Sequence, residues 1–281
     1  MIDAHMHLWD LNRLSYPWLE DLPRINRTFL VEDFDAARGG REIDAVVFVQ
    51  AECRHEQYRD ELRWVQSLAD RDRRLRGIVP WAPLEDGAAV AADLEQIAAD
   101  PRVKGVRRII QFEDDLGFCL QPGFVRGVQL LADYGLHFEI TIAPRHFPRV
   151  MKLVEACPDT RFILDHIGNP DIAAGETEPW RTSLREFAAS GPHRCKFSNL
   201  VCNADLDRWT IDDLRPYAEV VIEAFAPDRL IWAGDWPHVL RASGYLRWLE
   251  TAETLTAHLS ESDRRKIFHD NAAEFYRLDT A

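Results

Sequence analysis

The sequence has few cysteines, and their spacing is unlike that of a disulfide framework or a zinc finger. There are five among 281 residues, an odd number, and no two of them form a C-x-x-C pair. Small secreted modules and zinc-binding domains carry such pairs at short, regular spacings. We therefore expect a reducing, cytoplasmic environment, in which most of these thiols pack as small apolar side chains.

Long apolar runs and clusters of basic residues are also missing. No stretch approaches the roughly 18 apolar residues of a membrane-spanning helix, and Asp3, His5 and His7 interrupt any start that could resemble a signal peptide. Acidic residues outnumber basic ones by 47 to 34, which gives a formal net charge of −13. This balance disfavours binding to nucleic acid or to an anionic membrane. The expected partner is a small molecule, while the oligomeric state, a homodimer included, is left open.

Eight short apolar segments recur at intervals of roughly 30 residues, the length of one strand–helix unit. Most are continuous rather than alternating, as in a parallel sheet that is buried on both faces. Apolar stripes of helical period fill most of the gaps between them. This α/β pattern predicts a single (β/α)8 TIM barrel over residues 1–281, with a long loop around residues 9–42 after the first strand. The strands are expected to begin at Ile2, Ile43, Leu75, Val103, Leu136, Arg161, Cys195 and Arg229.

An open, doubly wound sheet is the alternative α/β architecture. Such a sheet usually places a glycine-rich turn after its first strand, where the backbone binds a phosphate group. Here that turn reads H-L-W-D-L-N and contains no glycine. The barrel is therefore the expected fold.

The first strand carries Asp3, His5 and His7 on alternate positions. Side chains at this spacing share one face of a strand, so we expect all three to point the same way. Catalytic residues of (β/α)8 barrels collect at the C-terminal ends of the strands, where His7 would lie. Two imidazoles so placed can bind one metal ion. A bare H-x-H motif is often a coincidence, and its position on the first strand of a barrel is what favours a site.

Charged side chains also end other predicted strands. His166 follows F-I-L-D, Asp235 follows L-I-W-A-G, and Arg107 and Arg108 interrupt the apolar segment V-K-G-V-R-R-I-I-Q. A charged group at the end of an apolar strand needs a partner, and the mouth of the barrel supplies one. Three histidines and an aspartate from strands 1, 6 and 8 are hard to explain as separate core residues. Their convergence indicates an active site.

Three motifs resemble the amidohydrolase superfamily: D-A-H-M-H on the first strand, F-I-L-D-H-I-G-N-P on the sixth and G-D-W-P on the eighth. The segments K-G-V-R-R-I-I-Q, C-P-D-T-R-F-I-L-D-H and N-A-A-E-F-Y-R-L are similar to one branch of it, the metal-dependent hydrolases that include sugar-acid lactonases. The likeness runs over nearly the whole chain. It implies a (β/α)8 barrel that opens a lactone such as L-fucono-, L-rhamnono- or galactonolactone, or a related muconolactone or pyrone.

In lactone hydrolysis, water attacks the carbonyl carbon and the resulting oxyanion must be stabilised. Asp235 is the expected general base, and His5, His7 and His166 are expected to polarise the carbonyl with or without a metal ion. Arg107 or Arg108 would hold a carboxylate. The two face opposite ways in a strand, and the resemblance favours Arg107. The other predicted substrate-binding residues are Gln50, Lys196, Trp81 and His238.

The chain departs from this branch on strands 5 and 7, and also on strand 4, where Arg107 and Arg108 replace the lysine or glutamate that members with a full metal centre often carry. Members with a full metal centre carry a histidine at the end of strand 5, where this chain has F-E-I-T-I-A with Glu139 and Thr141. We therefore expect at most one divalent ion, with zinc favoured, and leave activity without metal open. Strand 7 reads K-F-S-N where K-x-S-G is usual, so Asn199 is expected to reshape the pocket wall. The expected metal ligands are His5, His7 and Asp235, with His166 as a fourth group.

Two other functions stay open at this point. Non-oxidative decarboxylases share similar motifs on strands 1 and 8, but they generally keep the strand-5 histidine that this chain lacks. A non-catalytic barrel that binds a sugar acid would have little use for Asp235 together with three histidines. Both are therefore less favoured than the lactonase.

Overall fold

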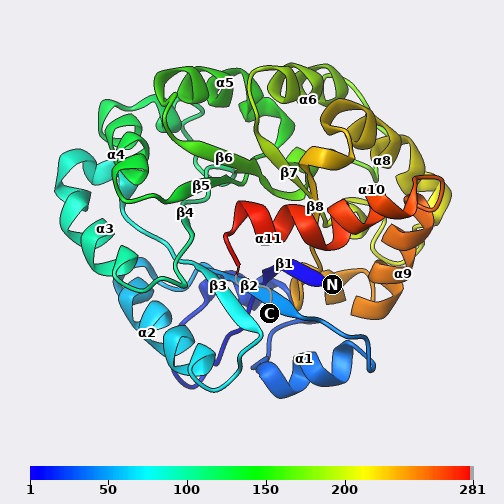
Figure 1. The fold of residues 1–281 in the computed structure, drawn as a ribbon, viewed down its shortest axis with the longest axis horizontal. Coiled ribbons are helices and arrows are strands. Elements are labelled where there is room, and N and C mark those ends of the chain that lie inside the picture. The colour runs from blue at the N-terminus through cyan, green and yellow to red at the C-terminus, as the bar shows by residue number, and fades with distance from the viewer. Residues whose placement is uncertain (279–281) are drawn as a thin grey trace.

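The computed structural model describes residues 1–278. Within them, short parallel strands alternate with helices, and the helices surround the strands as a (β/α)8 barrel (Figure 1). This is the fold that the recurring apolar segments predicted. The strands are β1 (Ile2–Met6), β2 (Ala45–Val49), β3 (Leu75–Val79), β4 (Gly105–Arg107), β5 (His137–Ile140), β6 (Arg161–Leu164), β7 (Arg194–Phe197) and β8 (Leu230–Trp232).

Helices follow each strand, and short 3₁₀ turns precede several of them. None of the helices among residues 1–278 is long and apolar enough to cross a membrane. The helices are α1 (Val31–Ala37), α2 (Tyr58–Ala69), α3 (Ala91–Ala98), α4 (Pro122–Asp133), α5 (Phe147–Ala156), α6 (Trp180–Ala189), α7 (Leu200–Asn203), α8 (Ile211–Phe225), α9 (Tyr245–Leu255), α10 (Glu261–Arg265) and α11 (Asn271–Phe275).

The strands form two sheets, ordered β1-β2-β3 and β4-β5-β6-β7-β8. Isolated parallel bridges join their edges: Ile78 of β3 pairs with Val103 just before β4, and Met6 of β1 pairs with Trp236 just after β8. These bridges bring the edges of the two sheets together around the barrel. The second bridge also sets the C-terminal ends of β1 and β8 side by side.

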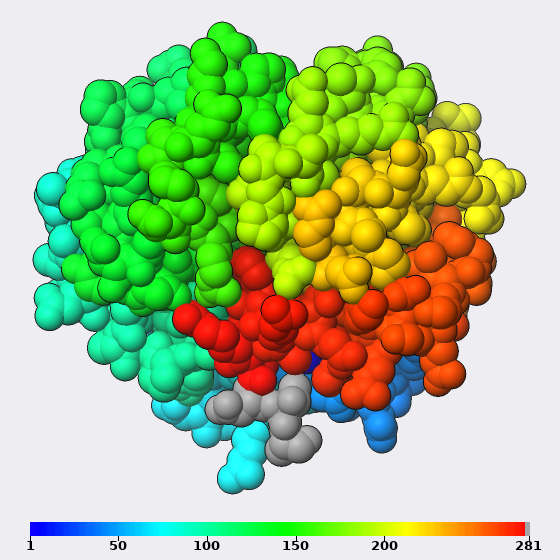
Figure 2. Space-filling model, turned by 45° about the horizontal axis from the view of Figure 1, so that its top comes forward, coloured from blue at the N-terminus to red at the C-terminus, as the bar shows by residue number. Residues whose placement is uncertain are grey.

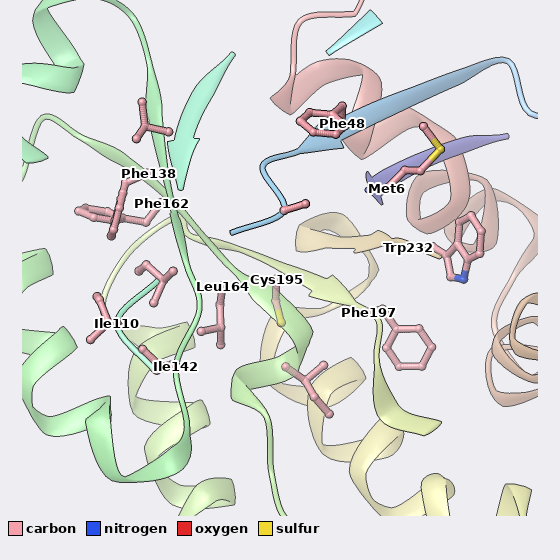
Figure 3. Close-up of a cluster of buried hydrophobic side chains, with 14 of the residues drawn as sticks. Met6, Phe48, Ile110, Phe138, Ile142, Phe162, Leu164, Cys195, Phe197 and Trp232 are labelled. Carbon is pink, nitrogen blue, oxygen red and sulfur yellow. The ribbon is translucent and has the colours of Figure 1, made fainter. Parts of the chain in front are cut away.

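Both faces of the strands are buried, which explains their continuous apolar sequences. Small and branched side chains such as Ala4, Val47 and Ile231 belong to one buried cluster. A second, larger cluster packs the other face of the strands against the helices. Figure 3 shows part of it, including Phe138 and Phe162 on neighbouring strands, whose ring centroids are 6.3 Å apart.

The C-terminal segment covers one end of the barrel. In Figure 1, α11 lies across the near end of the strands, and in Figure 2 the red residues of this segment fill the centre of the face shown. Ser260 begins this segment, and its hydroxyl accepts a hydrogen bond from the Asp263 N–H at 3.1 Å. A π-helical turn, Lys266–Asp270, then connects α10 with α11.

A bulge in β1 corrects the prediction that Asp3 shares a face with the two histidines. Asp3 pairs with Val46, and Met6 pairs with Phe48. Between these two pairs β1 advances by three residues and β2 by only two, so β1 contains one extra residue. The Asp3 side chain consequently lies on the other face of β1 from the His5 ring, and its carboxylate accepts hydrogen bonds from the Gly234 N–H at 2.8 Å, the Tyr245 hydroxyl at 2.9 Å and the His5 backbone N–H at 3.1 Å. It anchors β1 to the outer helix α9 and takes no part in the candidate site.

The long segment after β1, residues 9–42, reaches the mouth of the barrel. Trp9 and Phe29 pair across it, and it contains the 3₁₀ turn Pro17–Asp21 as well as α1. The Trp18 indole donates to the carbonyl of Ala51, just after β2, at 2.9 Å. The segment therefore forms part of the wall of the cavity described next.

Candidate active site

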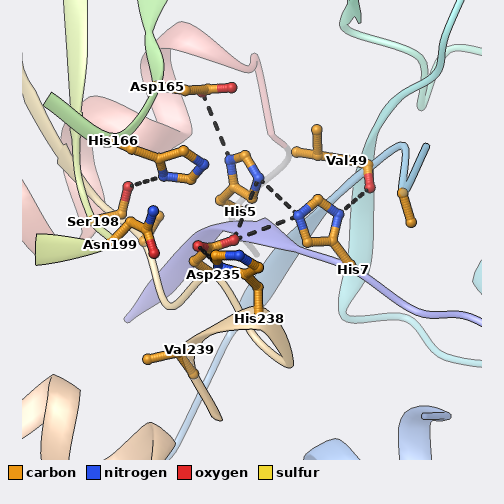
Figure 4. Close-up of polar contacts among 12 residues, drawn as sticks. His5, His7, Val49, Asp165, His166, Ser198, Asn199, Asp235, His238 and Val239 are labelled. Atoms are coloured by element: carbon orange, nitrogen blue, oxygen red, sulfur yellow. Dashed lines mark hydrogen bonds and ion pairs between the residues drawn. The ribbon is translucent and has the colours of Figure 1, made fainter. Parts of the chain in front are cut away.

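A cavity of about 620 Å³ opens at the C-terminal ends of the strands. It is lined there by residues that end or follow β1, β2, β4, β5, β6, β7 and β8. Three of the four predicted catalytic residues, His7, His166 and Asp235, line it directly. The fourth, His5, is 0% exposed and lies against them, with its ring 4.6 Å from that of His166. The structure thus brings these residues of strands 1, 6 and 8 together (Figure 4).

Backbone hydrogen bonds between the ends of β1 and β8 hold this group together. The Asp235 N–H donates to the His5 carbonyl at 2.9 Å, and the His7 N–H donates to the Trp236 carbonyl at 2.7 Å. Asp235 also has a positive φ of 52°, an unusual conformation for a residue with a side chain. Its carboxylate Oδ1 thereby lies 3.4 Å from His7 Nε2 and 3.8 Å from His5 Nε2.

The hydrogen-bond partners of the two strand-1 histidines differ: those of His7 indicate its tautomer, whereas those of His5 are donors on both sides. His7 Nδ1 lies 2.7 Å from the Val49 carbonyl, which only accepts, so Nδ1 carries the proton and Nε2 has a free lone pair. His5 Nδ1 lies 2.9 Å from Lys196 Nζ, which as an ammonium only donates. His5 Nε2 lies 3.1 Å from His7 Nε2 and 3.2 Å from Arg107 Nη1, which also only donates, so both ring nitrogens of His5 face a cationic donor.

All three histidines are neutral at neutral pH because burial disfavours the imidazolium form. Burial, reinforced by the positive charge of Lys196, holds the pKa of His5 well below its usual value. Burial also lowers the pKa of His7, and it lowers that of His166 to about 4. Neutral imidazoles are the form that either binds a metal ion or donates a hydrogen bond to a substrate.

Asp235 is ionised in the same surroundings. Burial by itself would raise the pKa of this carboxyl, but the adjacent rings of His166 and His238, with a hydrogen bond from His238, hold it well below the usual range. The His238 ring contributes Nδ1 at 3.0 Å from Asp235 Oδ2, and Arg241 in turn contacts His238 Nε2 at 2.9 Å. The other carboxylate oxygen, Oδ1, is left for the centre of the site.

The backbone bends sharply where β6 and β7 end. His166 and Asn199 have positive φ values of 53° and 64°, and both line the cavity. His166 Nδ1 lies 2.8 Å from the hydroxyl of Ser198, which fixes the ring with Nε2 on the opposite side. Left-handed residues of this kind cost of order 1–3 kcal/mol each and cluster at functional sites.

A buried ionic cluster lies on the far side of His5. The Lys196 ammonium is 2.6 Å from Glu139 Oε2 and 3.0 Å from Asp165 Oδ1, and all three side chains are fully buried. Burial would raise the pKa values of Glu139 and Asp165. The Lys196 ammonium instead holds the pKa of Glu139 below its usual value and that of Asp165 well below it. Two buried carboxylates thus carry their charge because one lysine sits between them.

Two groups of side chains in the described part of the chain offer metal-ligand atoms within 4.8 Å of one another: His5, His166 and Asp235, and His5, Glu139 and Asp165. The Lys196 ammonium already lies among the second group at 2.6–3.0 Å. The first group, with His7 beside it, faces the cavity. This arrangement favours one cation at the first group, because the second has its own positive charge.

The chemistry of the first group fits a divalent ion such as zinc. Nitrogen ligands at 2.0–2.1 Å around a tetrahedral ion lie roughly 3.3 Å apart, and His5 Nε2 and His7 Nε2 are 3.1 Å apart. Two features oppose tight binding. The Arg107 guanidinium lies 3.2 Å from His5 Nε2, and a neutral His5 that binds a cation through that nitrogen must carry its proton on Nδ1, which faces the Lys196 ammonium.

Of the six predicted substrate-binding residues, Arg107 and His238 line the cavity. Arg107 is fixed by the Gln50 carbonyl, which accepts from its Nη2. Among the described residues, the other four predicted substrate-binding residues do not line the cavity, and each contacts another side chain. Arg108 faces the opposite way, as the alternation of a strand requires, and is paired with Glu85 and Glu113. The side chains of Trp81, Gln50 and Lys196 contact His55, Glu52 and the ionic cluster, respectively.

Sequence reasoning missed several residues of the site. Asp165 directly precedes His166, and neighbouring residues of a regular strand face opposite ways, so the sequence gave no reason to direct both side chains into the barrel. The left-handed backbone at His166 allows both to point inward. Trp18 lines the cavity from the β1 loop, whereas Trp9 and Trp236 are buried in the core. Ser198, just before Asn199, could have been noticed as a polar residue at a strand end.

The chain matches the family model described as "Amidohydrolase" over residues 2–278. It is 31% identical over 288 residues to an L-fucono-1,5-lactonase of Burkholderia ambifaria, covering 99% of this chain and 96% of that protein. It is 23% identical to an L-rhamnono-gamma-lactonase of Scheffersomyces stipitis, with 99% and 98% covered. Among solved structures, an amidohydrolase of Burkholderia multivorans with bound zinc superposes with a TM-score of 0.88 at 28% identity, covering 99% of both chains.

The family model thus extends from the first strand to the last described residue and includes every side chain of the cavity. The resemblance first seen in D-A-H-M-H, L-D-H-I-G-N-P and G-D-W-P is confirmed over the whole barrel, and the chain belongs to the amidohydrolase family.

Proposed function

We propose that this protein is a lactonase, a hydrolase that opens the ring ester of a small sugar-acid lactone. The observation that carries the proposal is the placement of Asp235. This ionised carboxylate lines the cavity, and its Oδ1 lies 3.4 Å from His7 Nε2, while His238 holds its other oxygen at 3.0 Å. The lactonases among its relatives support the same reaction class.

In the proposed reaction Asp235 Oδ1 accepts a proton from a water molecule as the water oxygen bonds to the lactone carbonyl carbon. The tetrahedral intermediate then collapses, the bond between that carbon and the ring oxygen breaks, and the ring oxygen takes the proton from Asp235. The product is an open-chain hydroxy acid, which releases one proton to solvent at neutral pH.

The developing oxyanion needs positive charge and hydrogen-bond donors close by. Arg107 lines the cavity with its guanidinium fixed by Gln50, and His166 presents Nε2 because Ser198 occupies Nδ1. A divalent ion held by His5, His7, His166 and Asp235 would add Lewis-acid polarisation of the carbonyl. The cavity of about 620 Å³ is of the size usual for a small-molecule site.

Proton balance tests the proposal. Purified protein is mixed with L-fucono-1,5-lactone or L-rhamnono-γ-lactone in weak buffer with a pH indicator, and with 2,6-dihydroxybenzoate in parallel. We expect catalysed acid release from at least one lactone. Proton uptake with carbon dioxide evolution from the benzoate, and no lactone opening, would instead identify a decarboxylase. Binding of a lactone without turnover in metal-loaded and metal-free protein would identify a non-catalytic binding barrel.

A further inference from the structure

Asparagine side chains gather on one wall of the cavity, on the side of β6 and β7. Asn169 follows the 3₁₀ turn Asp165–Gly168, Asn199 follows β7, and Asn203 ends α7; all three line the cavity. Asn199 stands in K-F-S-N, next to Ser198, which contacts the His166 ring (Figure 4). The proposed reaction gives these amides no part.

One backbone carbonyl fixes the orientation of this amide group. Asn169 Nδ2 donates to the Ile142 carbonyl at 2.9 Å, so the other end of that amide, Oδ1, is the acceptor. Asn199 Nδ2 and Asn203 Nδ2 donate to this Oδ1 at 3.3 and 3.2 Å. A carbonyl cannot donate, so none of the three amides can be reversed without breaking the chain of bonds. The amide oxygen of Asn199 must therefore point away from Asn169.

That oxygen has no partner. Asn199 is only 5% exposed, and its Oδ1 is a buried polar atom without a hydrogen bond. An unpaired buried acceptor is unfavourable, and native structures usually pair such atoms with protein, water or ligand. The backbone adds a second cost, because Asn199 has φ +64° and ψ 8°, a left-handed conformation in which glycine is the least strained residue.

We propose that Asn199 Oδ1 accepts a hydrogen bond from a hydroxyl group on the bound ring, and so makes this enzyme selective for hydroxylated lactones. The choice of a lactone ring rests on the proposed function, and in such a ring hydroxyl groups are the hydrogen-bond donors. A site built to bond a hydroxyl rejects analogues that lack it, since its own polar atom is then left unpaired. Asn199 is thus a specificity-determining residue beside His166 and Asp235.

Asn199→Gly is a sharp test, because glycine suits the left-handed backbone while removing the amide. Ala226→Gly is the matched control: Ala226 also has a positive φ, +52°, but lies before β8, outside the residues that line the cavity. Binding is measured by calorimetry with two non-hydrolysable rings, L-fucono-1,5-lactam and unsubstituted δ-valerolactam. Hydrolysis of L-fucono-1,5-lactone by wild type is measured in the same preparations.

Wild type and Ala226→Gly should bind the hydroxylated lactam more tightly than the plain one. In Asn199→Gly the ratio of the two affinities should fall roughly tenfold. The variant loses one hydrogen bond to the hydroxylated lactam, and it no longer leaves an acceptor unpaired when the plain lactam binds. An equal ratio in all three proteins, or no lactam binding by wild type, overturns the inference. If the ratio falls only in Asn199→Gly but wild type opens no lactone, the inference holds for ring recognition and the proposed reaction is wrong.

Discussion

At the scale of single residues, the centre of the barrel contains two cations that could compete with a metal ion. Lys196 lies among His5, Glu139 and Asp165, and Arg107 lies 3.2 Å from His5 Nε2. Of the three central carboxylates, Glu139, Asp165 and Asp235, it is Asp235 that lines the cavity. His5 thus lies between a buried ionic cluster around Lys196 and the proposed reactive carboxylate, Asp235, at the cavity.

Asp235→Asn should lower kcat for lactone opening by roughly 10²–10⁴-fold, the usual contribution of a general base. KM should change much less, because the carboxylate acts mainly in the transition state. Initial rates over a range of lactone concentrations give both constants. Metal content must be measured in the same preparations, since loss of a ligand would also lower kcat. A variant with wild-type kcat would remove Asp235 from the mechanism.

Lys196→Met should destabilise the fold by about 3–5 kcal/mol, because it leaves two buried carboxylates without their counter-charge. Urea denaturation at pH 7 measures the free energy of unfolding. Lys152→Met is the control, since Lys152 is exposed on α5. Equal stability of the two variants would show that Glu139 and Asp165 do not depend on Lys196. If added zinc restores stability to Lys196→Met alone, a cation has replaced the ammonium.

At the scale of elements, the β1 loop is attached to the barrel through a buried carboxyl group on α2. Glu61 accepts hydrogen bonds from the Tyr16 hydroxyl at 3.3 Å and from the Ala51 N–H at 3.2 Å. Burial raises the pKa of Glu61 to about 8 from its usual 4.5. The folded chain therefore holds a proton here that the unfolded chain has already released.

The sign of this shift makes stability fall with rising pH. Between pH 4.5 and about 8 the folded state binds more protons than the unfolded state at Glu61, so its contribution declines by up to roughly 1.4 kcal/mol per pH unit. Glu61→Gln cannot titrate, and its amide oxygen can still accept from Ala51. Its stability relative to wild type should rise steadily from pH 5 to pH 8 in urea denaturation. Glu155→Gln, exposed on α5, should show no such trend.

At the scale of the whole molecule, the barrel gathers side chains from distant parts of the chain at one end. The last helices cover the other end, where the Tyr276 hydroxyl donates to Glu139 Oε1 at 2.8 Å. The ionic cluster around Lys196 is thus enclosed between these helices and His5. The other group of possible metal ligands, His5, His166 and Asp235, faces the cavity.

This arrangement predicts no more than one tightly bound divalent ion per chain. Elemental analysis of protein loaded with zinc and then dialysed measures the number retained, and a chelator should remove that ion because Arg107 and Lys196 oppose it. Two ions that survive dialysis would mean that Lys196 leaves the second ligand group when metal is present. Activity assays before and after chelation show whether catalysis depends on the ion.

The sequence by itself determined the fold and the group of residues that we propose to be catalytic. Continuous apolar strands at even spacing are sufficient for a (β/α)8 barrel, and its strand ends meet at one mouth, so His5, His7, His166 and Asp235 had to converge. Alternation also separated Arg107 from Arg108. These properties are local or follow from the symmetry of the fold.

Tertiary structure alone decided what depends on local backbone irregularities and on contacts between distant residues. The bulge in β1 turned Asp3 outward, and the left-handed turn after β6 brought Asp165 inside with His166. The position of the Lys196 ammonium between two carboxylates, and the unpaired oxygen of Asn199, depend on side chains from several strands. Neither spacing nor residue type encodes such contacts, because each is set by packing energies summed over the assembled barrel.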